Sequence, residues 1–134
     1  MSRRLLALAT GLTLVASTLA LAPRPAQAQP ATAAVDTEVS FSRVRAVNLA
    51  RDTAVKLNGG LTVYRPANCM FDTSLAGGSC LIRRDNQGFL FRFQGGAPGW
   101  QQLGLQPNWD TEILVSSDGR QVVQVVFNQP PGNR

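Results

Sequence analysis

The stretch SRVRAVNLARDTAVKLNGG, residues 42–60, decides the fold because its apolar residues recur at the spacing of one helical face. The residues of that face are Ala46, Leu49, Ala50, Thr53, Ala54 and Leu57. The polar side carries Arg45, Asn48, Arg51, Asp52 and Lys56. Alanine dominates the apolar face, so we expect the helix to lie close against the layer it covers. We expect it to begin after Asp36, capped by Asp36 or Ser40, and to end at residues 58–60, where glycine suits a left-handed cap and Leu61 folds back behind it.

Short strands are expected after the helix. Residues 61–65 alternate in character and stop at Pro66, which favours a short strand. Residues 80–84 and 89–93 flank Asp85-Asn86-Gln87-Gly88, a good turn sequence. If Arg84 lies opposite Phe89 in this hairpin, then Ile82 faces Phe91 and Cys80 faces Phe93.

A second hairpin joins residues 112–116 and 120–128 through Ser117-Asp118-Gly119. With Ser116 opposite Arg120, the expected core face is Ile113, Val115, Val123, Val125 and Phe127. The expected outer face is Glu112, Leu114, Ser116, Val122, Gln124 and Val126. Leu114, Val122 and Val126 make this outer face more apolar than a solvated face requires, which indicates a partner or a covering loop.

These patterns predict an α+β fold, with one N-terminal amphipathic helix packed on an antiparallel sheet of about four to five strands, in the order helix then β-meander. Residues 37–128 form this single domain. Residues 29–36 are interpreted as a flexible leader and residues 129–134 as a non-regular tail.

Residues 1–28 are typical of a secretory signal peptide. A basic start at Arg3 and Arg4 precedes a long apolar run, and Ala26-Gln27-Ala28 supplies the small residues of a cleavage site. The apolar run is just long enough to suggest a membrane anchor instead. Its threonines, serine and glycine weaken that alternative, so we expect cleavage after Ala28, secreted or periplasmic localisation and no stable membrane insertion afterwards.

Signal removal changes the charge. The chain has 13 basic and 8 acidic residues, and Arg3, Arg4 and Arg24 leave with the signal, so ten basic and eight acidic residues remain, a net charge of +2. In residues 29–134 the adjacent Arg83 and Arg84 are the only local basic pair. This charge provides no basic stripe, so no nucleic-acid partner is expected.

Cys69 and Cys80 are the only cysteines, and they lie in the exported part. In an oxidising compartment such a pair is expected to form a disulfide. A redox-active or metal-binding pair is the alternative, but the spacing is not C-x-x-C and the chain has no histidine.

The composition argues against common catalytic systems. Without histidine there is no Ser-His-Asp or Cys-His arrangement and no imidazole metal site. Lys56 is interpreted as a solvated charge. Asp110 and Glu112 share a strand face and could act as a glycosidase-like acid pair, although a solvated start of a strand is the favoured interpretation. No catalytic residue, metal site or cofactor is predicted.

The glycine-rich segment between the hairpins holds both tryptophans. Trp100 and Trp109 either cover the core as a lid or form a surface platform for a ligand or partner. Arg92 and Gln94, on the strand that leads into this segment, could line such a site. The predicted partner is an unidentified protein or small ligand in the extracytoplasmic space.

Several short stretches carry a resemblance to known proteins. The stretches 48–51, 58–61, 64–65, 91–93, 95–99 and 118–119 resemble small exported cyanobacterial proteins of unknown function. The order of elements is similar in outline to PepSY and cystatin-like domains. The resemblance implies a shared fold and an extracytoplasmic location, and it brings no catalytic residues.

The leading hypothesis is therefore a non-enzymatic extracytoplasmic binding or accessory module. One alternative is a small hydrolase or sugar-active enzyme that uses Asp110 and Glu112. Another is an envelope component that associates with itself through Leu114, Val122 and Val126.

Overall fold

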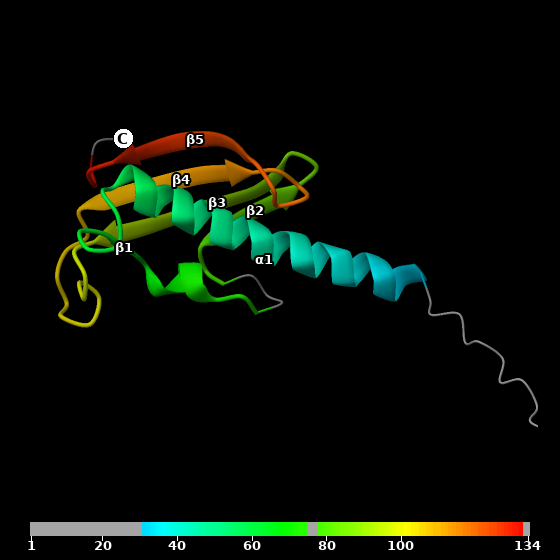
Figure 1. Ribbon diagram of the computed structural model, residues 1–134, viewed down its shortest axis with the longest axis horizontal. Helices are drawn as coiled ribbons and strands as arrows, with labels where there is room; N and C mark the ends of the chain where they lie inside the picture. The colour runs from blue at the N-terminus through cyan, green and yellow to red at the C-terminus, as the bar shows by residue number, and fades with distance from the viewer. Residues whose placement is uncertain (1–30, 75–77, 133–134) are drawn as a thin grey trace, which may run out of the picture.

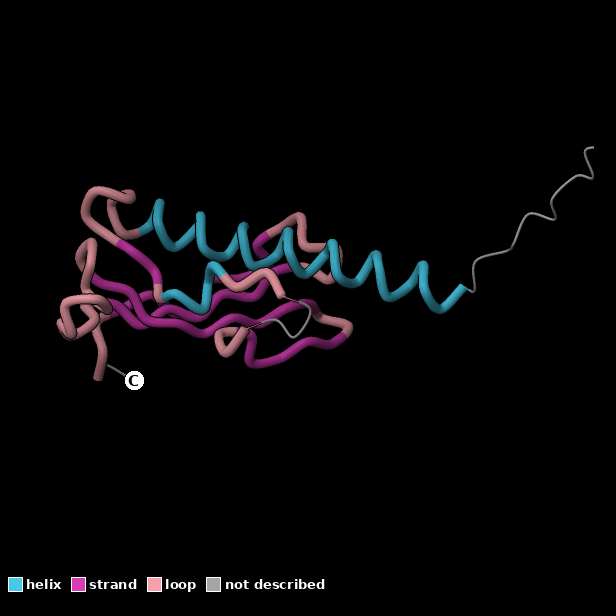
Figure 2. The backbone as a smooth tube through the Cα atoms, turned by 90° about the horizontal axis from the view of Figure 1, so that it is seen from below, coloured by secondary structure: helices cyan, strands magenta, loops and turns pink. Residues whose placement is uncertain are grey.

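One helix lies across one face of a five-stranded sheet, which confirms the predicted α+β class. The computed structural model describes residues 31–74 and 78–132, so the predicted signal peptide and the last two residues lie outside the described part. The helix, α1 (Ala31–Leu57), forms one layer and the sheet the other (Figures 1 and 2). The first turns of α1 extend beyond the edge of the sheet (Figure 1).

The helix begins earlier than expected. It starts at Ala31, so the predicted flexible leader 29–36 is helical from Ala31 onward. Alanine has the highest helix propensity, and no residue between Ala31 and Asp36 breaks the helix, so Asp36 and Ser40 lie inside it and do not cap it.

The end of α1 is where the sequence placed it. The Gly60 N–H donates to the Val55 carbonyl at 2.8 Å and the Asn58 N–H to the Ala54 carbonyl at 3.1 Å, the pattern of a glycine-terminated helix. The buried stripe follows Ala46, Ala50 and Ala54, which are all 0 % exposed. Leu57 lies beside this stripe and is 52 % exposed, so its expected place on the covered face is wrong.

The sheet contains β1 (Arg65–Pro66), β2 (Leu81–Asp85), β3 (Gly88–Gly96), β4 (Trp109–Val115) and β5 (Val122–Gln129). The antiparallel order is β1-β3-β4-β5, and β2 also pairs with β3. The segment 61–63, expected to belong to a strand, is a turn closed by a bond from the Tyr64 N–H to the Gly60 carbonyl at 2.9 Å. The helix cap at residues 59–60 continues into this turn, which leaves two residues for β1.

The first hairpin has the predicted register at its turn, with Arg84 opposite Phe89. Further along, Leu81 lies opposite Phe91, because a bulge between Leu81 and Arg83 takes up Ile82. The expected pairing of Ile82 with Phe91 is therefore wrong.

The second hairpin differs more from the expectation. Val115 lies opposite Val122, so the turn spans residues 116–121 and Val122 packs against the core and does not face outward. Two register shifts, between Glu112 and Ile113 and between Leu114 and Val115, follow along β5. They bring Val125 opposite Ile113 and Phe127 opposite Glu112.

These shifts change the faces that the sequence assigned. Val123 is exposed and Phe127 shares the outer face with Glu112, so the expectation that both lie in the core is wrong. Val125 is on the helix side, as expected, although part of it stays exposed. Leu114 and Val126 remain off the core, as the sequence indicated.

The core lies between α1 and the sheet. Its buried residues are Ala46, Val47, Ala50, Ala54, Tyr64, Met70, Cys80, Phe89, Phe91, Phe93, Ile113 and Val115. The small alanines let the helix approach the three phenylalanines of β3 closely. Tyr64 lies over Gly95, where an added Cβ would be 2.3 Å from the Tyr64 hydroxyl, so only glycine fits there.

Candidate functional site

The outer face of the sheet carries an ion pair between β3 and β4. Arg92 and Glu112 lie opposite each other, and the Arg92 Nε–H donates to Glu112 Oε2 at 2.6 Å. The Arg92 guanidinium also lies 5.7 Å from the centre of the Phe127 ring. Glu112 is only 7 % exposed, so its carboxylate is buried. Arg92 balances the negative charge of this carboxylate.

Asp110 and Glu112 share this face of β4, as predicted, but the favoured interpretation of a solvated start of a strand is wrong. Asp110 is buried as well as Glu112, because the neighbouring strands β3 and β5 flank them on both sides. Neither carboxylate lines either of the two pockets described below. Gln94, which lies opposite Asp110, is exposed on the same face.

The two tryptophans have different roles. Trp100 is 8 % exposed, and its indole Nε1–H donates to the Arg65 carbonyl at 3.0 Å. Trp109 is the first residue of β4 and packs half-buried against the core. The tryptophan segment therefore closes this end of the fold, while Trp100 also forms one wall of a pocket.

That pocket adjoins a larger one, and together they form one continuous concave surface. The smaller pocket, about 290 Å³, is lined by Arg65, Pro66, Asn68, Phe71, Gly99, Trp100, Gln101 and Gln102. The larger pocket, about 490 Å³, is lined by Arg51, Asp52, Val55, Lys56, Leu61, Arg65 and Phe71. Arg65 and Phe71 line both, so we call the combined surface the Arg65–Phe71 groove.

Three elements build the groove. The last turns of α1 supply Arg51 and Val55, which lie on one side of the helix because they are four residues apart. The turn after the helix cap supplies Leu61. Strand β1 supplies Arg65, and the short helix η1 (Asn68–Phe71) supplies Phe71.

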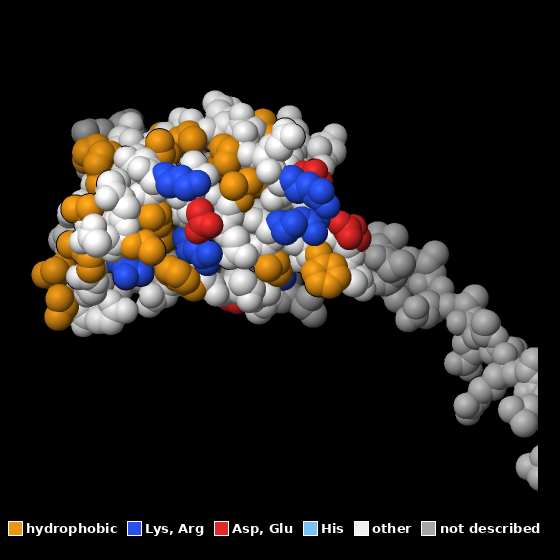
Figure 3. Space-filling model, viewed as in Figure 1, with side chains coloured by type: hydrophobic (Ala, Val, Ile, Leu, Met, Phe, Trp, Pro, Cys, Tyr) orange, Lys and Arg blue, Asp and Glu red, His pale blue; other side chains and the backbone are white. Residues whose placement is uncertain are grey.

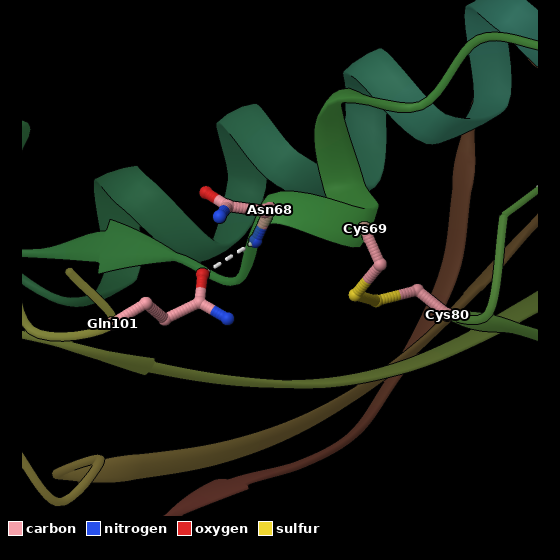
Figure 4. Close-up of a disulfide and its surroundings, with 4 residues drawn as sticks. All are labelled: Asn68, Cys69, Cys80 and Gln101. Carbon is pink, nitrogen blue, oxygen red and sulfur yellow. Dashed lines mark hydrogen bonds between the residues drawn. A yellow bond between two sulfur atoms is a disulfide. The ribbon is translucent and has the colours of Figure 1, made fainter. Parts of the chain in front are cut away.

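Two links hold η1 in place (Figure 4). The disulfide between Cys69 and Cys80, with a Cα–Cα distance of 5.6 Å, joins η1 to the residue before β2. The predicted disulfide is thus confirmed. The Asn68 backbone N–H donates to Gln101 Oε1 at 2.7 Å, which ties η1 to the tryptophan segment.

The groove carries more positive than negative charge. Arg51, Lys56 and Arg65 line it together with one acid, Asp52, which pairs with Arg51 at 3.3 Å. The Arg51 guanidinium also lies 5.0 Å from the centre of the Phe71 ring. On the left half of the face in Figure 3, basic side chains surround one acidic group with hydrophobic side chains beside them.

Sequence reasoning missed this site. Arg51 and Lys56 appeared only as polar residues of a solvated helix side. Arg65 appeared only in an expected strand and in a stretch of resemblance, and Phe71 carried no local motif. The residues come from α1, β1 and η1, so no spacing along the chain could bring them together. Of the residues proposed as a ligand surface, only Trp100 lines the groove; Arg92, Gln94, Leu114 and Val126 are on or beside the other face of the sheet.

The described residues contain no group of three or more His, Cys, Asp or Glu side chains that could hold a metal ion. Within residues 31–74 and 78–132, no helix is long and apolar enough to cross a membrane.

The fold and groove define a small single-helix α+β domain with a cationic, partly apolar surface groove. Comparisons with known proteins find no matching family model, no similar curated protein and no similar solved structure. The resemblance to small exported cyanobacterial proteins, and to PepSY and cystatin-like domains, therefore stays a prediction.

Proposed function

We propose that the protein is an exported, non-enzymatic binding module whose ligand lies in the Arg65–Phe71 groove. The observation that carries the proposal is the meeting of three cationic side chains and an exposed aromatic ring, Phe71, around one concave surface. Ligand sites in proteins are typically concave and mostly apolar, with a few charged or polar groups that orient the ligand.

The lining indicates the chemistry of the ligand. The three cations outnumber the single acid, which favours an anionic group on the ligand. Val55, Leu61 and Phe71 supply apolar surface beside them. The larger pocket falls within the range of roughly 300–1,000 Å³ that small-molecule sites occupy. The expected ligand is therefore a small amphiphilic anion with a carboxylate or phosphate head and an apolar body.

Two further observations support the other parts of the proposal. Glu112, one half of the conceivable acid pair, is already neutralised by Arg92, which disfavours it as a general acid or nucleophile. The disulfide and the signal-like residues 1–28 both favour an oxidising, extracytoplasmic location.

Calorimetric titration with dodecyl phosphate tests the proposed ligand class. Binding is expected, and Arg65→Gln should weaken it by roughly tenfold because one charge-assisted contact is lost. The substitution leaves the Arg65 carbonyl, which accepts the Trp100 N–H bond, in place.

Arg84→Gln is the matched control. Arg84 is also exposed but lies on β2, away from the groove lining, so its substitution should leave the affinity unchanged. Dodecyl maltoside, which has the same tail without charge, and inorganic phosphate, which has no tail, should each bind more weakly. Equal binding of dodecyl phosphate and dodecyl maltoside, or equal loss with Arg84→Gln, would contradict the proposal.

A further inference from the structure

Two loops leave the sheet at the same end of the molecule. The first, residues 57–64, contains the last residue of α1 and the turn before β1, and the second, residues 97–108, joins β3 to β4. Strand β1 pairs with the last two residues of β3, which places both loops at that end. Both lie at the left in Figure 1. We call these two segments together the loop end.

The loop end exposes apolar side chains and carries no charge. Neither segment contains an aspartate, glutamate, lysine or arginine. Its exposed apolar side chains are Leu57, Leu61, Val63, Leu103 and Leu105, and the most exposed, Leu103, reaches 69 %. Hydrophobic side chains accordingly line the left edge of the face in Figure 3. Exposed apolar patches of this kind mark surfaces that contact another molecule or a membrane.

The second loop presents its leucines from a hydrogen-bonded backbone. Trp100 is buried at the base of the loop. The Leu103 N–H donates to the Gly99 carbonyl at 3.0 Å, and the Leu105 N–H donates to the Trp100 carbonyl at 2.8 Å. Residues 101–106 are nevertheless all exposed. The exposure of the two leucines is therefore built into the fold of the loop.

Cationic side chains lie directly behind the loop end. Arg51, Lys56 and Arg65 line the Arg65–Phe71 groove, and Leu61 lines the same pocket. The second loop continues that surface, because residues 99–102 line the adjoining pocket together with Arg65. An apolar tip with cations behind it suits an anionic bilayer. Aliphatic side chains enter the boundary between headgroups and acyl chains, and lysine and arginine attract the anionic headgroups.

We propose that the loop end docks on the surface of a bilayer that contains anionic lipids. Its leucines and its valine lie at the acyl boundary, and the three cations of the groove face the lipid phosphates. The contact is peripheral and needs no spanning segment. The inference rests on the proposed function for the anion preference of these cations, whereas the apolar loops are independent of it.

The composition of the loop end favours a bilayer over a protein partner. The residues that dominate protein–protein affinity are typically tryptophan, tyrosine and arginine, whereas leucine and valine are under-represented among them. The exposed apolar side chains of the loop end are leucines and a valine. The lack of charge in both loops also fits a bilayer, because a charged side chain is costly to place among acyl chains.

Sedimentation with vesicles tests this docking surface. Protein from the extracytoplasmic fraction should sediment with vesicles of phosphatidylcholine and phosphatidylglycerol in equal parts. It should bind at least about tenfold more weakly to phosphatidylcholine alone, because the three cations then lose their anionic partners. Leu103→Asp should weaken binding to the anionic vesicles by at least about tenfold, because it places a charge at the tip of the loop.

Val123→Asp is the matched control. Val123 is also an exposed aliphatic residue, at 56 %, but it lies beside the turn between β4 and β5, at the other end of the sheet. The substitution adds the same charge and should leave vesicle binding unchanged. Equal losses for Leu103→Asp and Val123→Asp, or equal binding to both kinds of vesicle, would overturn the inference.

Dodecyl phosphate separates this inference from the proposed function. Leu103 lines neither pocket, so Leu103→Asp should retain its affinity for dodecyl phosphate while it loses vesicle binding. A protein that binds dodecyl phosphate but no vesicles would overturn the docking alone and assign the loop end to a protein partner. A protein that binds anionic vesicles but not dodecyl phosphate would overturn the groove ligand alone.

Amide hydrogen exchange gives a second readout that needs no variant. The backbone amides of residues 101–106 should exchange more slowly when anionic vesicles are present. Those of the turn at residues 116–121, at the other end of the sheet, should not change. Unchanged exchange along residues 101–106 in the vesicle-bound protein would show that another surface makes the contact, which would overturn the inference.

Discussion

At the scale of single residues, Tyr64 shows how a buried polar group is placed in this core. Its side chain is buried over Gly95, and within the described residues no hydrogen bond of normal geometry reaches its hydroxyl. Burial raises the pKa of the Tyr64 phenol above its usual value, and the neighbouring Thr111 and Asn58 side chains oppose part of that shift. The folded protein therefore holds this proton more tightly than the unfolded chain does.

This shift predicts a pH dependence of stability. The contribution of Tyr64 to the free energy of unfolding is complete below about pH 10, the usual pKa of tyrosine. It is lost as the pH rises further through the raised pKa of the folded protein. Tyr64 is the only tyrosine, so the alkaline change in tyrosine absorbance follows it alone. The midpoint of this absorbance change should lie above the usual pKa of tyrosine. In denaturant unfolding, Tyr64→Phe should lack the part of the alkaline loss of stability that Tyr64 causes.

At neutral pH, the same substitution should change the free energy of unfolding by less than about 1 kcal/mol, because no hydrogen bond of normal geometry reaches the hydroxyl within the described residues. Thr111→Val is a useful comparison. The Thr111 hydroxyl donates to Asn128 Oδ1 at 2.7 Å, so its removal should lower the free energy of unfolding by about 1 kcal/mol. A loss of several kcal/mol for Tyr64→Phe would contradict this account of Tyr64.

At the scale of elements, the turn between β4 and β5 is docked on α1. The Arg45 guanidinium donates to the Asp118 carbonyl at 2.9 Å and 3.1 Å. Within the turn, the Ser116 hydroxyl donates to the Asp118 carboxylate and lowers the pKa of Asp118. Gly119 has a φ of +74°, and a Cβ there would lie 2.0 Å from the Ser42 carbonyl oxygen of α1. The helix and the hairpin thus meet backbone to backbone.

Gly119→Ala should consequently lower the free energy of unfolding by roughly 2–4 kcal/mol, as measured by urea denaturation. Gly104→Ala separates the strain of a positive φ from the steric clash with α1. Gly104 also has a positive φ, +64°, but no atom of the described residues lies within 4 Å of an added Cβ there. Gly104→Ala should lower the free energy of unfolding by about 1 kcal/mol, because only the strain of the positive φ contributes there. Equal losses for the two variants would show that the contact with α1 contributes nothing.

At the scale of the whole molecule, the predicted export and the disulfide can be measured together. The intact mass of protein from the extracytoplasmic fraction of its host should correspond to a chain that starts at Gln29 and is lighter by two hydrogens. Reduction should restore those two hydrogens. A mass that retains residues 1–28, or one that reduction does not change, would contradict the export prediction or the disulfide.

The boundary between what could and could not be predicted follows the range of the interactions. The alanine stripe and the glycine cap of α1 could be predicted because they depend on successive contacts between residues four or five apart in the chain. The pairing of Arg84 with Phe89 follows from a two-residue turn. The register of β5 could not be predicted, because a six-residue turn and two bulges decide it through contacts with β4.

The sequence by itself determined the α+β class, the end of the helix, the two hairpins and the Cys69–Cys80 pair, since each depends on local periodicity, turn chemistry or the number of cysteines. The tertiary structure decided which face each valine of β5 occupies, the burial of Glu112 beside Arg92, and the Arg65–Phe71 groove. These features depend on how separate elements pack against each other, and packing selects among arrangements that the local patterns permit equally.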